Sequence, residues 1–125
     1  MESFSLCSRA VRGAITVDSN SSDSIRSATI ELLSTILEKN NIKKSDIVYI
    51  YFTLTSDLDA AFPAKFARLD LGFNLVPMMC SNELLVKESL KLALRVLLVF
   101  NTYKSQDQIN HIYLKGAKVL RPDLA

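Results

Sequence analysis

The spacing of apolar residues after position 25 predicts one long helix with a single buried side. Apolar residues recur three and four positions apart, at Ile25, Ala28, Leu32, Leu33, Ile36 and Leu37. This is the spacing of a helix that packs one face against a core. Ser22 is a candidate N-cap in the polar stretch before the pattern. Lys39 in the last turn, with Asn40 and Asn41 after it, predicts where the helix ends.

Two segments on either side of this helix have the composition of β-strands. Residues 9–17 (RAVRGAITV) end in β-branched side chains, and Gly13 among them marks a bulge or a close approach of another group. Residues 46–55 (DIVYIYFTLT) form a short, continuous apolar and aromatic run. Such a run predicts a strand that is buried on both of its faces.

Shorter elements are predicted in the second half of the chain. Pro63 suits the first turn of a short helix, and Gly72 would end it. Residues 74–80 look extended, because the residue before a proline is biased toward β geometry. Residues 111–114 have the pattern of a short strand.

Residues 84–100 fit both a helix and a strand, and the choice decides where Arg95 points. Their leucine content favours a helix, in which Arg95 would lie beside Lys91 toward solvent. In a strand, alternate residues place Arg95 on the less bulky face, where there is room for a partner. An unpaired charge is costly to bury, so the strand requires an anion opposite Arg95. The periodicity alone does not decide between the two.

Composition and charge limit the classes of protein to which the chain can belong. Its 125 residues suffice for one domain, with 49% hydrophobic and 22% charged residues, as in globular proteins. We expect residues 1–8 to be a flexible N-terminal extension and residues 9–125 to form the single domain. A net charge of +2 without a basic stripe argues against nucleic acid and membrane as partners.

The cysteines carry little chemical information beyond the compartment. Cys7 and Cys80 lie far apart and have neither the spacing of a metal site nor that of a disulfide framework. We therefore expect a reducing compartment, the cytoplasm, or a plastid if the source is a plant or an alga.

Nothing in the residues indicates covalent or general-base catalysis. His111 is the only histidine, and no nucleophile elbow, phosphate-binding loop or dinucleotide fingerprint occurs. Lys65 and Arg68 lie three apart in the predicted short helix, where a solvated basic edge is the simpler interpretation. Arg12, Glu83, Cys80 and Tyr113 also have ordinary structural interpretations. Arg95 is the one candidate for which an ordinary role would be strained.

Six segments occur in a familiar order and at familiar separations. They are VRGAITV, TSDLDAAFPAKFAR, VPMMCSNE, LRVLLVFNT, QDQINHIYL and VLRPDL, spanning about Arg9 to Leu124. Together they resemble the monofunctional chorismate mutases of the small trimeric α+β class typified in bacilli. That family converts chorismate to prephenate on the route to phenylalanine and tyrosine, by a Claisen rearrangement that needs no base, nucleophile, metal or cofactor.

The resemblance also implies a fold. It implies an α+β chain whose mixed sheet carries one long and one or two short helices, and it places Arg95 in a strand. Three such chains would form a homotrimer with a pseudo-barrel, and the active sites would lie in clefts between subunits.

Site roles follow from the resemblance, residue by residue. Arg95 matches the arginine that contacts the ether oxygen and a carboxylate of the substrate, and Arg12 matches a second carboxylate-binding arginine. The Tyr113 hydroxyl matches a contact in the same region. Glu83 and Cys80 match the groups that hold the ring hydroxyl.

Further residues match the periphery of the family's site. Those matching a wall supplied by the neighbouring subunit are Phe62, Ala64, Lys65 and Arg68. Those matching a C-terminal tail that closes over the site are Leu120 and Arg121. The chain departs from the family at Asn110, where an arginine is frequent, and at residues 86–90 (VKESL), which replace a more glycine-rich segment. Neither departure removes a proposed catalytic group, but both bear on substrate affinity.

Two other functions are compatible with the same architecture. A non-catalytic trimeric protein that binds small carboxylates would use the same cations, although it would not need Glu83 to orient a hydroxyl. A trimeric imine deaminase also places an arginine at a subunit cleft, but its substrates lack the second carboxylate.

Overall fold

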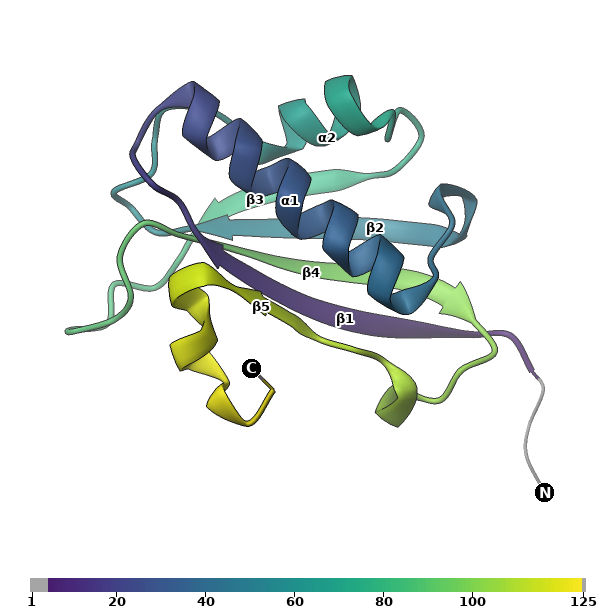
Figure 1. Ribbon diagram of the computed structural model, residues 1–125. Helices are drawn as coiled ribbons and strands as arrows, with labels where there is room; N and C mark the ends of the chain where they lie inside the picture. The colour runs from purple at the N-terminus through teal and green to yellow at the C-terminus, as the bar shows by residue number, and fades with distance from the viewer. Residues whose placement is uncertain (1–4, 125) are drawn as a thin grey trace.

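The chain folds into one mixed β-sheet with its two α-helices on the same side. We analysed a computed structural model, which describes residues 5–124. The strands are β1 (Cys7–Thr16), β2 (Ile47–Leu54), β3 (Met78–Asn82), β4 (Ala93–Thr102) and β5 (Ile112–Leu114), and the helices are α1 (Ser22–Asn40) and α2 (Pro63–Leu71) (Figure 1). The 3-10 turns are Lys44–Asp46, Gln106–Gln108, Lys115–Leu120 and Pro122–Leu124. This architecture confirms the predicted α+β class.

The sheet has the strand order β3-β2-β4-β1-β5. The central strand β4 runs antiparallel to both β1 and β2, while β3 and β5 run parallel to β2 and β1. Figure 1 shows α1 lying along the sheet and α2 beside its N-terminal half, above β3.

Local signals define the ends of both helices. The N-cap of α1 is Ser21, whose hydroxyl accepts a hydrogen bond from the Ser24 N–H at 3.1 Å, so the predicted cap, Ser22, was wrong by one residue. Asn41 ends α1 in the left-handed conformation, as the sequence indicates. In α2, Pro63 occupies the first turn and Gly72, with φ of 72°, ends the helix.

The ambiguous segment 84–100 divides into a loop and a strand. Residues 84–92 form no regular element, and β4 begins at Ala93, so Arg95 lies in a strand. The side chains of Leu94, Val96 and Leu98 point into the core beneath the helices. Arg95 therefore points to the opposite face of the sheet.

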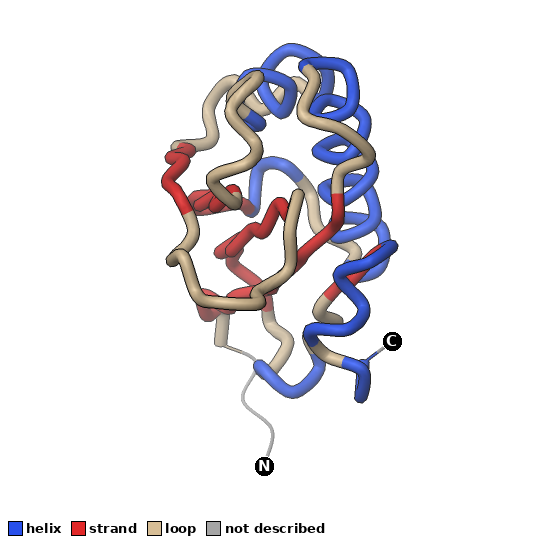
Figure 2. The backbone as a smooth tube through the Cα atoms, turned by 90° about the vertical axis from the view of Figure 1, so that its left-hand side faces the viewer, coloured by secondary structure: helices blue, strands red, loops and turns tan. Residues whose placement is uncertain are grey.

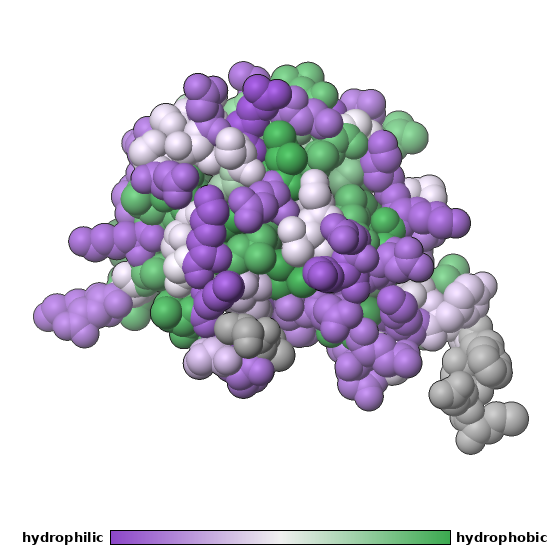
Figure 3. Space-filling model, in the orientation of Figure 1, coloured by the Kyte–Doolittle hydropathy of each residue, from purple (hydrophilic) through white to green (hydrophobic). Residues whose placement is uncertain are grey.

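The face of the sheet opposite the helices is only partly covered in the single chain: Ala14 and Tyr113 are buried there against Ala117, but much of β2 is not. Ile50 and Phe52 of β2 are buried under the helices, but Tyr49 and Tyr51 are 40% and 38% exposed on the other face. The expectation that β2 is buried on both faces was wrong, because both helices lie on one side (Figure 2). The outer surface of the helical layer, in contrast, is largely hydrophilic (Figure 3).

Gly13 allows α1 to lie close to β1. A Cβ at this position would come within 2.7 Å of Cδ1 of Ile36 and 3.0 Å of Cγ1 of Val96. The close approach predicted at Gly13 is therefore that of the helix side chains, on the face opposite Arg12.

The boundary expected between the N-terminal extension, residues 1–8, and the domain falls inside the first strand. Cys7 and Ser8 already belong to β1, and the remaining expectation of flexibility falls largely on residues 1–4, which lie outside the described residues. Among residues 5–124, no helix has the length and apolar character that a bilayer crossing requires.

The loop before β4 contains a strained residue that glycine would relieve. Glu88 has φ of 65°, a conformation that costs a residue with a Cβ about 1 kcal/mol. We expect Glu88→Gly to raise the free energy of unfolding by about 0.5–1 kcal/mol, measured by denaturant titration. Glu88→Ala keeps the Cβ and removes the same carboxylate, so it should give no such gain; equal stability of the two variants would contradict the prediction.

Candidate active site

A cavity on the uncovered face brings together the four residues predicted to be catalytic. It has a volume of about 380 Å³, and its walls include Arg12, Glu83, Arg95 and Tyr113. Thr53 contributes to the same wall. These residues come from β1, β2, β4, β5 and the segment after β3, so the cavity depends on the order of the strands.

Strand register places the cavity residues beside one another. Arg95 pairs with Thr53 of β2 on one side and with Ala14 of β1 on the other. Ala14 in turn pairs with Tyr113 of β5. Because paired residues point to the same face of a sheet, Arg95 lies between the small side chains of Thr53 and Ala14. That arrangement leaves room above the guanidinium.

The anion opposite Arg95 is the carboxylate of Glu83. The Nε of Arg95 lies 3.4 Å from Oε2 of Glu83. The side chains of the two residues are 41% and 21% exposed. The Glu83 backbone N–H donates to the Leu54 carbonyl at 2.8 Å, which fixes the residue just beyond the end of β3. The pair is therefore partly open to the cavity and not sealed in the core.

Thr53 is a site residue that the sequence analysis missed. Its hydroxyl donates a hydrogen bond to Oε2 of Glu83, the same oxygen that faces Arg95. The hydroxyl thus orients the carboxylate from below. The only signal in the sequence is that Thr53 is a polar residue inside an apolar strand, which by itself does not identify a partner.

His111 supports Arg12 through the backbone. Its Nδ1 accepts a hydrogen bond from the Arg12 N–H at 2.9 Å, which requires Nδ1 to be unprotonated. Partial burial lowers the pKa of His111 below its ordinary value of 6.5, and the positive charges of Arg12 and Arg121 lower it further. The neutral imidazole therefore serves to attach β5 to β1 beside the cavity.

The C-terminal residues Leu120 and Arg121 lie beside the site, and the charge of Arg121 is already paired with Asp123. Tyr113 is only 8% exposed, and Leu120 lines a neighbouring cavity of about 720 Å³ whose wall also includes Glu83 and Arg95. The Arg121 guanidinium donates two hydrogen bonds to Asp123, at 3.1 and 2.9 Å. This carboxylate raises the pKa of Arg121, and Tyr113 adds a smaller contribution.

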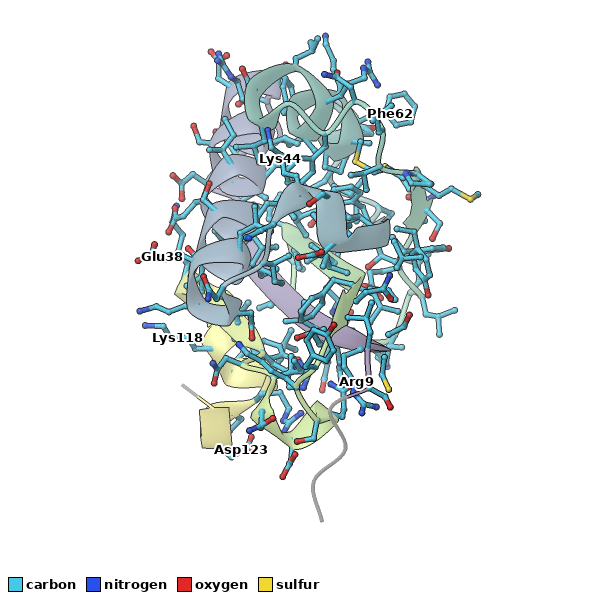
Figure 4. The ribbon with its side chains drawn as sticks, turned by 90° about the vertical axis from the view of Figure 1, so that its right-hand side faces the viewer. Arg9, Glu38, Lys44, Phe62, Lys118 and Asp123 are labelled. Carbon is cyan, nitrogen blue, oxygen red and sulfur yellow. The ribbon has the colours of Figure 1, made fainter. Side chains whose placement is uncertain are left out.

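The predicted wall residues lie apart from this cavity within the chain. Phe62 and Lys65 line a different cavity of about 570 Å³, which includes none of the four catalytic candidates. Cys80, predicted to hold the ring hydroxyl together with Glu83, lines this second cavity and not the one that contains Glu83. Ala64 packs against the core, and Arg68 is exposed on α2. In Figure 4, Phe62 lies near one end of the molecule, whereas Asp123, which belongs to the C-terminal tail, lies near the other. One chain thus presents two separate groups of predicted site residues.

Cys80 has the environment of a packing residue and not of a nucleophile. Burial raises the pKa of its thiol, and a hydrogen bond with the Ala64 backbone only partly opposes this. The protonated thiol links β3 to the start of α2. Cys7 and Cys80 are both free.

Asn110 is directed at the end of α1. Its side-chain amide donates to the Lys39 carbonyl at 3.0 Å, and its backbone N–H donates to Oδ1 of the buried Asn40 at 2.7 Å. Asn40 also donates to the carbonyls of Ile36 and Asn110. Asn110, where the resemblance leads one to expect an arginine, therefore binds the C-terminal end of α1. Within residues 5–124, no cluster of His, Cys, Asp and Glu side chains is suited to a metal ion.

The lowered pKa of His111 predicts how stability depends on pH. Between the folded-state pKa and 6.5 the unfolded chain binds more protons, so the folded state loses stability as the pH falls through this range. Because the chain has one histidine, this loss should be absent in His111→Gln. Denaturant titrations of both proteins between about pH 5 and 8 test this. Parallel profiles would show that the imidazole does not contribute.

Comparisons with known proteins agree with one another. Residues 8–124 match the family model described as "Chorismate mutase type I". The chorismate mutase AroH of Bacillus subtilis is 42% identical over 117 residues, covering 94% of this chain and 92% of that protein. The AroH of Thermus thermophilus is 44% identical over 117 residues, covering 93% and 95%.

A solved structure extends the likeness to the fold. The structure of a chorismate mutase from Clostridium thermocellum is 47% identical, with a TM-score of 0.86, and covers 88% of this chain and 97% of that one. The match to the family model, over residues 8–124, includes the residues of every strand that line the cavity. With these matches over nearly its whole length, and with Arg12, Glu83, Arg95 and Tyr113 gathered in one cavity, the chain belongs to the type I chorismate mutase family.

Proposed function

We propose that this chain is a chorismate mutase that rearranges chorismate to prephenate in aromatic amino acid biosynthesis. The observation that carries the proposal is the cavity with two cations, Arg12 and Arg95, beside the carboxylate of Glu83. The substrate is a dicarboxylate with an enol-ether oxygen and a ring hydroxyl. Each of these groups has a matching partner in the cavity.

The reaction needs charge stabilisation and a fixed substrate conformation. The carbon–oxygen bond of the ether breaks while a carbon–carbon bond forms within the same molecule, and no proton is transferred. Partial negative charge develops on the ether oxygen in the transition state. A fixed cation there binds the transition state more strongly than the ground state, which lowers the barrier.

Arg95 takes the role of this cation. The guanidinium stays protonated and presents a rigid fork of donors. With Nε facing Glu83 at 3.4 Å, the rest of the fork can serve the ether oxygen and one substrate carboxylate. Such a preorganised donor contributes about 3–4 kcal/mol in comparable sites.

Glu83, Arg12 and Tyr113 hold the remaining groups of the substrate. Glu83, oriented by Thr53, accepts a hydrogen bond from the ring hydroxyl. Arg12 and the Tyr113 hydroxyl bind carboxylate oxygens. Clamping both carboxylates selects the compact conformer in which the reacting carbons meet, and such positioning contributes several kcal/mol.

We further propose that the site is completed by a second copy of the chain in a homotrimer. The uncovered sheet face supports this, because Tyr49, Tyr51 and Leu97 are 37–40% exposed there and would be buried against a neighbour. Phe62, which is 71% exposed, would then form a wall of the neighbour's cleft together with Ala64, Lys65 and Arg68. Clefts between subunits are common positions for binding sites.

The tail would close the cleft after the substrate binds. Leu120 lines a cavity together with Glu83 and Arg95, and Arg121 is paired with Asp123. For Arg121 to contact a substrate carboxylate, it would have to exchange that partner. A cytoplasmic location belongs to the same proposal, and the two free cysteines support a reducing compartment.

Substitution of Arg95 tests the chemistry. The wild-type protein should remove the ultraviolet absorbance of chorismate and form prephenate without added metal or cofactor. Arg95→Ala should lower kcat by about 10³-fold or more, and Arg95→Lys should recover little, because a single ammonium cannot reproduce the fork. Near-normal turnover in either variant would refute this role of Arg95. Binding of chorismate by calorimetry without conversion would instead indicate a carboxylate-binding protein.

Mixed assemblies test the shared cleft. Arg95→Ala disables the cavity and leaves the wall intact, whereas the double variant Lys65→Ala/Arg68→Ala does the reverse. Each alone should be nearly inactive, but co-refolded chains should regain a substantial fraction of wild-type activity, since some clefts then combine two intact halves. A mixture no more active than its components would argue against a shared site. Mixing preformed assemblies without refolding is the control.

A further inference from the structure

We propose that Asp57 is a positioning residue for Arg95: its carboxylate holds the first residues of β4, and so fixes where the guanidinium stands in the cavity. Asp57 lies in the loop after β2 and is not among the residues assigned to substrate binding, although it lines a cavity together with Glu83. The inference rests on the proposed function, because it concerns the same reaction.

The contacts of Asp57 are directed at the backbone just before β4. Both carboxylate oxygens accept from the Leu92 N–H, at 3.2 and 3.0 Å. The Thr55 hydroxyl donates to Asp57 Oδ1 and accepts from the Ala93 N–H at 3.0 Å. The Thr55 N–H donates to the Ala93 carbonyl at 3.1 Å. Asp57 and Thr55 together thus satisfy both backbone N–H groups at the entrance to the strand.

Leu92 needs such support because its backbone is strained. Its φ of 49° lies in the left-handed region, which a residue with a Cβ adopts at a cost in energy. Strained conformations persist where the surroundings determine them from several sides. Here the Leu92 carbonyl also accepts from the Val17 N–H at 2.7 Å. The Asp57 carboxylate, which binds the Leu92 N–H, and Val17 just after β1, which binds the Leu92 carbonyl, hold Leu92 in this conformation.

The held residues are close enough to Arg95 to transmit a displacement. Ala93 lies two residues before Arg95, on the same face of β4, and is buried. If Leu92 relaxed to a right-handed conformation, the direction of the chain entering β4 would change at Ala93. The guanidinium would then move relative to the carboxylate of Glu83, which is attached to β2 through Leu54 and Thr53.

Two threonines, Thr53 in β2 and Thr55 just after it, therefore orient the two halves of the charge pair. Thr53 donates to Glu83 and so orients the carboxylate, while Thr55 donates to Asp57 and so supports the strand that carries the cation. Loss of Asp57 should affect the rate of the chemical step more than substrate binding. A displacement of about 1 Å at a catalytic group can cost about 10²-fold in rate.

The experiment compares Asp57→Ala with Asp57→Asn and with a core control, by kcat, KM and denaturant titration. Asp57→Ala should lower kcat by about 10- to 100-fold with KM changed less than about threefold. Asp57→Asn should restore kcat to within about threefold of wild type, because its amide oxygen can accept from both Leu92 and Thr55. Ile42→Ala truncates a buried side chain before β2, at the opposite end of that strand, so it should lose stability and keep kcat.

Each outcome decides for or against the proposal. A folded Asp57→Ala protein with kcat within about threefold of wild type would overturn it, and so would an equal loss of kcat in Ile42→Ala. If Asp57→Ala does not fold, Thr55→Val, which removes the shared hydroxyl, is compared with Thr55→Ser, which keeps it; equal kcat values would also overturn it. Failure of the proposed function appears separately, as a wild-type protein that does not convert chorismate, and the inference then falls with it.

Discussion

The antiparallel pairing of β2 with β4 determines the position of the charges in this protein. In the observed register Thr53 lies beside Arg95, and its hydroxyl holds the carboxylate that faces the guanidinium. A shift of β4 by one residue would turn Arg95 into the core beneath α1 and would expose both Leu94 and Val96. Burying a guanidinium among apolar side chains costs several kcal/mol, so the apolar pattern of β4 and the charge of Arg95 enforce the same register.

The two faces of the sheet have different functions. One face carries the core, where α1 packs closely enough to exclude a Cβ at position 13. The other carries the cavity, and tyrosine and leucine side chains surround the charged residues there. Both helices are placed on the first face, so within residues 5–124 the second is covered only in part, where Ala117, Leu90 and Leu120 pack around Ala14 and Tyr113. The site thereby lies on a face that the chain leaves partly open.

Elements that depend on interactions between neighbouring residues could be predicted from the sequence. Features that depend on residues far apart in the sequence could not. The spacing of α1 and the Pro63 and Gly72 signals of α2 depend on neighbouring residues, and both helices are confirmed. The N-cap was wrong by one because several polar residues in a row offer equivalent caps. The apolar run of β2 predicts burial on both faces, but Tyr49 and Tyr51 remain 40% and 38% exposed, because the run does not report which face the helices cover.

The candidate site was predictable only in part. Charge and apolar context single out Arg95, but the leucine-rich segment around it fits a helix as well as a strand, and its pairing with β1 and β2 is not visible in the periodicity. Thr53 and Asp57 act through hydrogen bonds to residues 30 and 35 positions away, and no periodicity reports such pairings. Asn110, which departs from the family pattern, is accounted for only by the end of α1 that it closes.

The partial exposure of the Arg95–Glu83 pair has a consequence for how the proposed enzyme would respond to dilution. In a lone chain water reaches both side chains and weakens the field between them, since the effective dielectric constant is high at a protein surface. A neighbour seated on the bare face would displace that water and strengthen the field without moving either group. The catalytic electrostatics would then be a collective property, weakest in chains too dilute to associate.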